Sequence, residues 1–135
     1  MSKEDSILIG IINFDDILNE DSIGKNFNVK RYGPCEIIVY TTEGNIPHFH
    51  IVSNDNKFKC CVRIYENRYF SHGDNKGKLN SKECKELDKW LRQQHDTSKY
   101  GIMTNWNKIE SIWRNAHNNI PPTLDQPDYR KILEG

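Results

Sequence analysis

The sequence predicts an α+β domain, in which an antiparallel meander of about four or five strands precedes two helices packed on one face of the sheet. Three observations support this fold class. Residues 46–65 alternate in the manner of a β-hairpin, and residues 35–42 are rich in β-branched and aromatic side chains. Two amphipathic helical patterns then follow, one after Asn80 and one after Thr104.

The first 26 residues are expected to form an N-terminal extension. Residues 7–12 predict a short buried strand, although the same apolar residues also suit a helical stripe. Asn13 can cap a short helix over residues 14–20. Gly24 and its polar neighbours indicate the boundary of the core domain, which we place at residues 27–117.

The core domain is expected to open with two strands, at residues 27–32 and 35–42, joined at Gly33-Pro34. A turn at residues 42–45 leads into the central hairpin. After the hairpin, Glu66-Asn67 can form another tight turn into a short strand over residues 68–71.

The central hairpin has a well-specified register, because a shift of one residue would exchange its two faces. With Asp55-Asn56 as the turn, Ser53 lies opposite Phe58. One face is then apolar, and we expect it to be core: Phe49, Ile51, Cys60 and Val62. The opposite face carries two histidines beside cationic side chains: His48, His50, Lys59, Cys61 and Arg63.

The two helices carry clear start signals. Asn80 and Glu83 have the spacing of a capping box, and Thr104 can cap the second helix. The expected buried stripe of the first helix is Cys84, Leu87, Trp90 and Leu91, and that of the second is Trp106, Ile109, Ile112, Trp113 and Ala116. The polar residues 93–99 are expected to end the first helix, with Gly101 beyond them.

Residues 118–135 are expected to be an extended C-terminal tail, because they contain three prolines and few apolar residues. Tyr129, Ile132 and Leu133 offer a point at which this tail can dock on the domain.

Composition restricts the function classes. The 135 residues carry 19 basic and 19 acidic side chains, which disfavours a nucleic-acid binder while leaving room for a local basic patch. No apolar run is long enough to cross a membrane, and the N-terminus lacks the order of a signal peptide. The four cysteines show no CxxC spacing, so we expect reduced thiols in a cytoplasmic protein with no cofactor.

Several of these residues occur in an order that resembles a family of small bacterial proteins, a domain of unknown function (number four-one-six-zero). The matching residues are Pro47-His48-Phe49-His50, Leu87 with Trp90, and Asn105 with Trp106. The resemblance covers roughly residues 28–117. It implies the fold and the position of a site, in a bacterial or phage protein, and it hints at a toxin–antitoxin-like or inhibitory role. The family has no established activity.

The candidate ligand-binding residues are His48, His50, Lys59, Cys61 and Arg63. Two imidazoles beside two cations suit a phosphate or a carboxylate. A metal site is a second interpretation, with Cys61 or His72 as the third ligand, but the adjacent cations disfavour it. In a third interpretation the histidines are structural and lie under the helix that carries Trp106.

The sequence therefore predicts a non-enzymatic binding or regulatory module that contacts a protein or a small anionic ligand. The alternative from another class is a small hydrolase or nuclease that uses His48 and His50, with or without a metal. No P-loop, nucleophile elbow or glycine-rich nucleotide motif accompanies them.

Overall fold

The computed structural model describes residues 6–14, 32–40, 46–71, 77–97, 101–116 and 125–135. These ranges form an α+β fold, as predicted. A four-stranded antiparallel sheet is followed in the chain by two helices and a small two-stranded sheet, which lies between the helices in sequence. No helix within the described ranges is long and apolar enough to cross a membrane.

The main sheet has the order β1-β2-β3-β4, so neighbours in the chain are neighbours in the sheet. Its strands are β1 (Ser6–Asn13), β2 (Pro34–Tyr40), β3 (His48–Ser53) and β4 (Lys59–Arg63). The predicted strands at residues 7–12, 35–42 and 46–65 are thus present as a meander. The first was predicted to be buried, which was wrong, because it is an edge strand with Ile7, Leu8 and Ile11 exposed. The predicted strand at residues 27–32 and the helix at residues 14–20 lie largely outside the described residues.

The register of the β3–β4 hairpin is confirmed. Phe49 pairs with Val62 and Ile51 with Cys60, and all four side chains are buried in the core. The turn differs from the prediction. It closes between Ser53 and Asn56, where the Asn56 amide donates to the Ser53 carbonyl at 3.0 Å, so its central residues are Asn54 and Asp55. Asn56 follows with a φ of 61°.

Polar side chains explain this turn. The Asp55 carboxylate accepts hydrogen bonds from the Ser53 hydroxyl at 2.7 Å and from the Lys57 amide at 3.0 Å. Side-chain bonds of this kind stabilise tight turns, and asparagine tolerates the positive φ that follows. The Ser53 amide still bonds the Phe58 carbonyl at 3.0 Å, which keeps the predicted register.

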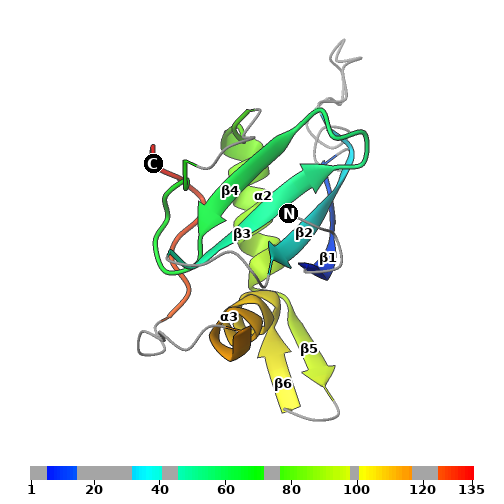
Figure 1. Ribbon diagram of the computed structural model, residues 1–135, viewed down its shortest axis with the longest axis vertical. Coiled ribbons are helices and arrows are strands. Elements are labelled where there is room, and N and C mark those ends of the chain that lie inside the picture. Colours follow the sequence, from blue (N-terminus) through cyan, green and yellow to red (C-terminus); the bar gives the residue numbers. More distant parts are fainter. Residues whose placement is uncertain (1–5, 15–31, 41–45, 72–76, 98–100, 117–124) are drawn as a thin grey trace.

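Helix α2 (Ser81–Leu91) covers the core face of the sheet and lies behind the strands in Figure 1. The predicted capping box is present: Asn80 accepts from the Glu83 amide at 2.8 Å, and Glu83 accepts from the Asn80 amide at 2.8 Å. Helix α3 (Asn105–Ala116) lies beyond one end of the sheet (Figure 1). Its cap is also as predicted, since the Thr104 hydroxyl accepts from the Asn107 amide at 3.0 Å.

The first helix ends before Gln93, as predicted, but the hairpin that follows it was not predicted. Strands β5 (Gln94–Thr97) and β6 (Gly101–Thr104) come between the helices in the chain and form a hairpin that lies beside α3 (Figure 1). The hairpin forms because Asn105 makes hydrogen bonds to the end of α2. Its side chain donates to the Trp90 carbonyl at 2.8 Å, and its amide donates to the Gln93 carbonyl at 3.0 Å. The end of α2 is therefore held beside the start of α3, and the intervening chain folds back on itself.

The predicted strand at residues 68–71 is reduced to isolated bridges. Tyr69 bridges Val62 of β4, and Arg68 bridges Leu133 in parallel. The C-terminal segment (residues 125–135) thus lies along the β4 side of the sheet (Figure 1). Its docking point was predicted correctly, since the Tyr129 side chain is fully buried in the core and Ile132 packs against the core. The domain boundaries at 26/27 and 117/118 fall outside the described residues.

Candidate functional site

On the sheet face away from α2, the strand register places residues of neighbouring strands side by side in rows. One row runs Leu8, Ile38, His50 and Cys61 across all four strands. The next row towards the β3–β4 turn runs Ile11, Glu36, Val52 and Lys59. His48 and Arg63 lie opposite each other at the other end of the hairpin. The structure therefore brings all five predicted site residues onto one face, which we call the histidine face.

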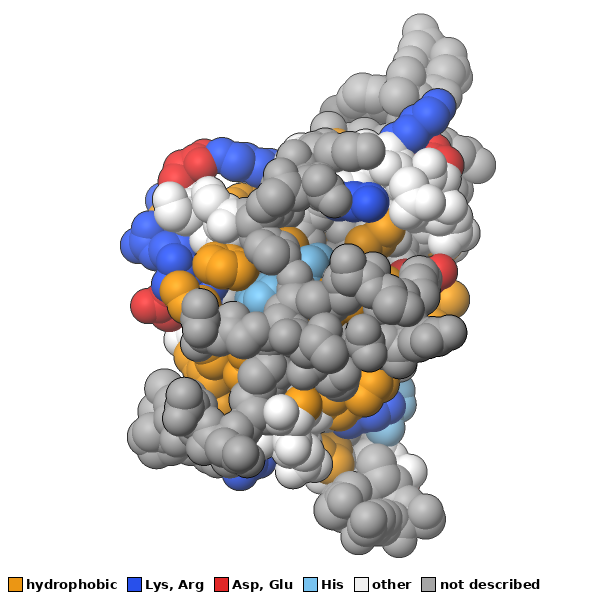
Figure 2. Space-filling model, viewed as in Figure 1, with side chains coloured by type: hydrophobic (Ala, Val, Ile, Leu, Met, Phe, Trp, Pro, Cys, Tyr) orange, Lys and Arg blue, Asp and Glu red, His pale blue; other side chains and the backbone are white. Residues whose placement is uncertain are grey.

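The histidine face is open in part only. Figure 2 shows this side of the molecule, with histidine side chains lying beside hydrophobic ones near the middle of the view. His48 and Cys61 are 1% and 2% exposed. His50, Lys59 and Arg63 are all partly exposed. A ligand at the surface therefore meets these last three side chains first.

His48 is held by its surroundings. Its Nδ1 lies 2.6 Å from the Ile46 carbonyl oxygen. Its ring lies 4.6 Å from the Phe70 ring and 5.3 Å from the Trp113 ring, measured between centroids. Trp113 belongs to α3, the same helix that carries Trp106. These contacts favour the structural interpretation for His48.

His50 contacts the thiol of Cys61. The Cys61 sulfur lies 3.2 Å from His50 Nδ1 and 3.9 Å from Nε2. The Tyr40 ring meets the imidazole edge-on with centroids 4.5 Å apart, and the His48 ring lies 5.1 Å away. His50 is therefore a partly exposed residue of the histidine face that contacts its buried residues, His48 and Cys61.

In the Arg63 guanidinium, Nη1 has a partner, whereas the described part of the structure shows no acceptor for Nε. Its Nη1 forms an ion pair with Glu66 at 3.0 Å, and its guanidinium lies 5.8 Å from the centre of the Phe70 ring. Its Nε is buried and finds no hydrogen-bond acceptor in the part of the chain that the structure describes. A buried donor left unsatisfied costs on the order of 1–3 kcal/mol.

The remaining neighbours of this site were not predicted. Tyr40 could have been found, because it lies two residues after Ile38 on the same strand and therefore on the same face. Trp113 lies on the helix that the third interpretation placed over the histidines, whereas no local pattern indicates the position of Phe70. Within the described ranges, no group of three or more histidine, cysteine or acidic side chains is placed to hold a metal ion.

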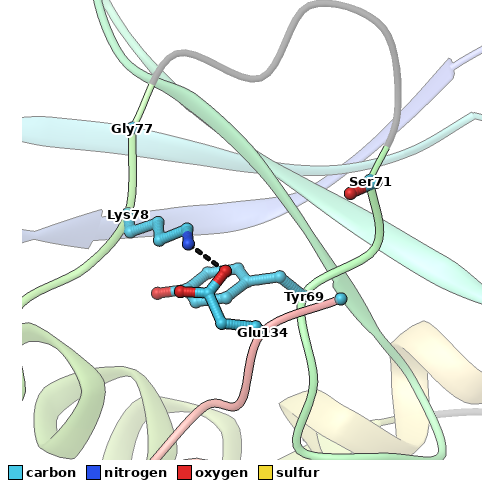
Figure 3. Close-up of a pocket in the computed structure, with 6 residues that line it drawn as sticks. Tyr69, Ser71, Gly77, Lys78 and Glu134 are labelled. Carbon is cyan, nitrogen blue, oxygen red and sulfur yellow. Dashed lines mark hydrogen bonds and ion pairs between the residues drawn. The ribbon is translucent and has the colours of Figure 1, made fainter.

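A separate pocket of about 230 Å³ lies where the C-terminal segment meets residues 69–71 and 77–78 (Figure 3). It is lined by Tyr69, Ser71, Gly77, Lys78, Glu134 and Gly135. Lys78 forms an ion pair with Glu134 across it, drawn as a dashed line. None of the five predicted site residues lines this pocket, so it is distinct from the histidine face.

Comparisons of the chain with models of protein families, with curated proteins and with solved structures found no match. The fold therefore defines the class, a small α+β protein with an antiparallel meander and two helices that follow the meander in the chain. The resemblance to the domain of unknown function stays a prediction.

Proposed function

We propose that this protein is a non-enzymatic binding or regulatory module of the cytosol, and that it recognises an anionic group through the exposed part of the histidine face. The anion is a phosphate or a carboxylate, carried by a protein or a small ligand. His50, Lys59 and Arg63 make the contact, while His48 and Cys61 support them from below.

The observation that carries this proposal is the unsatisfied Nε of Arg63. An arginine uses several donors at once when it binds a carboxylate or a phosphate. The Arg63 side chain is a quarter exposed, so a ligand at the surface can reach part of its guanidinium. Two further side chains of the same face, His50 and Lys59, add donors along the hairpin.

A cytosolic location is supported by the thiols. All four cysteines are free and buried, the state that a reducing compartment maintains. The structure contains no disulfide among them. A bacterial or phage origin and a toxin–antitoxin-like or inhibitory role rest on the resemblance alone.

The proposal predicts a phosphate-specific response at three residues. In an NMR titration with inorganic phosphate, at ionic strength held constant with chloride, we expect saturable shifts of the His50, Lys59 and Arg63 signals. Arg63→Gln and Lys59→Gln should each weaken the response, because each removes a cationic donor. Lys85→Gln, an exposed lysine on α2, is the matched control and should leave it unchanged. Equal shifts with chloride alone would contradict the anion site.

The alternative, a hydrolase or nuclease, draws on the contact between Cys61 and His50. A thiol 3.2 Å from an imidazole nitrogen has the geometry of a nucleophile beside a base. The 2% exposure of Cys61 argues against attack on a substrate. Turnover of a chromogenic ester or phosphodiester that is lost in His50→Ala would favour this alternative over the binding module.

A further inference from the structure

Strand β1 forms one edge of the main sheet (Figure 1). In the described part of the chain, β2 is its paired neighbour and no strand lies on its other side. The outer edge of such a strand presents backbone N–H and C=O groups that can pair with a further strand.

This edge is apolar and exposed. Five large hydrophobic side chains are exposed among the described residues, and three of them lie on β1: Ile7, Leu8 and Ile11, at 41%, 52% and 55%. The register places Leu8 and Ile11 on the histidine face, whereas Ile7 pairs with Val39 of the core face. Both faces of the edge therefore offer apolar contact area.

The strand also lacks charged residues and proline, two of the devices that usually keep an edge from pairing, and the register irregularity between Leu8 and Gly10 is a third such device that it does carry. Monomeric proteins place lysine, other charges or proline on exposed edge strands. The eight residues of β1 read Ser-Ile-Leu-Ile-Gly-Ile-Ile-Asn and contain neither a charge nor a proline. The irregularity between Leu8 and Gly10 still leaves a regular stretch, Gly10–Asn13.

We infer that β1 pairs with β1 of a second copy of this chain, so that two four-stranded sheets join into one. In an antiparallel pair about a two-fold axis, each strand presents the same residues to the other. Because β1 is uncharged, two copies meet without like-charge repulsion, and apolar side chains of one copy lie beside those of the other. A second copy also supplies a strand of matching length that is already extended, which lowers the entropy cost of pairing.

Sedimentation velocity of the full chain over a concentration series tests this inference. We expect a reversible monomer–dimer equilibrium. Leu8→Lys and Ile11→Lys should each raise the dimer dissociation constant at least about tenfold, because each places two like charges in the paired edge. Ile11→Thr keeps a β-branched residue in the strand and should raise the constant less.

The control is Ile102→Lys, which places the same charge on the exposed side chain of β6 and should leave the dimer intact. Circular dichroism and thermal unfolding verify that each variant is folded. Two results would overturn the inference. One is a wild-type chain that stays monomeric up to about 1 mM. The other is a dimer that persists unchanged in both folded lysine variants of β1.

Discussion

Gly10 lies in β1 directly under the indole of Trp90 from α2. A Cβ built on Gly10 would lie 2.5 Å from Cζ2 of Trp90, closer than side-chain carbons approach each other. The indole can therefore pack on the strand only because this position has no side chain.

Gly10→Ala should lower the free energy of unfolding by roughly 1–3 kcal/mol, the usual cost of inserting a carbon into a packed contact. Urea unfolding measures the loss. Trp90→Phe replaces the indole with a smaller ring, so the double variant Gly10→Ala/Trp90→Phe should lose less than the sum of the two single variants. Strictly additive losses would show that the two residues do not compete for the same space.

At this scale, the sequence predicted which residues share a face but not which of them are covered. Alternation along β3 and β4 was sufficient to place His48, His50 and Arg63 together. The burial of His48 was one of three open interpretations, because Phe70 and Trp113, which cover it, come from other segments of the chain. A local sequence pattern shows on which face of a strand a residue lies, whereas the burial of that residue depends on contacts with residues distant in sequence.

Among the elements, α2 is joined to the C-terminal segment by one buried carboxylate. Asp88 accepts hydrogen bonds from the Tyr129 amide at 3.0 Å, from Gln126 at 3.2 Å and from Arg92 at 2.9 Å. The sequence interpretation missed this role, because Asp88 lies in a helix beside the apolar stripe and resembles an ordinary surface residue.

Asp88→Asn keeps the shape of the side chain but removes its charge, and it replaces one acceptor oxygen with a donor. We expect a loss of about 1–3 kcal/mol of stability and faster hydrogen exchange of the Tyr129 amide, because hydrogen bonds to charged groups are the stronger ones. Glu86→Gln, on the same helix, is the matched control. Unchanged exchange at Tyr129 would mean that other contacts hold the segment.

The β5–β6 hairpin shows where element prediction failed. Its strands have four residues each, and His95, Asp96 and Ile102 are exposed, so no alternation of buried and exposed residues indicates them. The hairpin forms because Asn105 ties both helices together. A helix cap is visible in a sequence, but a side chain that bonds a carbonyl fifteen positions earlier is not.

For the whole molecule, buried thiols contribute to the response of stability to alkaline pH. Burial raises the pKa of Cys60 well above the ordinary 9.0, and it also raises the pKa of Cys84. Between 9.0 and the raised values, the unfolded chain loses these protons while the folded chain keeps them. The unfolded state then binds fewer protons, so stability falls as pH rises.

Urea unfolding at pH 8, 9 and 10 should therefore show a decreasing free energy of unfolding. Burial raises the pKa of Tyr69 as well, which acts in the same direction above 10.0. Cys60→Ala removes one ionising thiol and should make the decrease with pH shallower, whatever its effect on stability at pH 8. An identical slope in this variant would show that Cys60 does not contribute.

Tyr129 completes the core from the C-terminal side. Its hydroxyl donates to the carbonyls of Arg63 and Ile64 at 2.6 and 2.8 Å, and its ring meets that of Phe49. During synthesis on the ribosome, the meander and both helices emerge before this residue does. The nascent domain therefore has an open core next to Phe49 until Tyr129 leaves the exit tunnel.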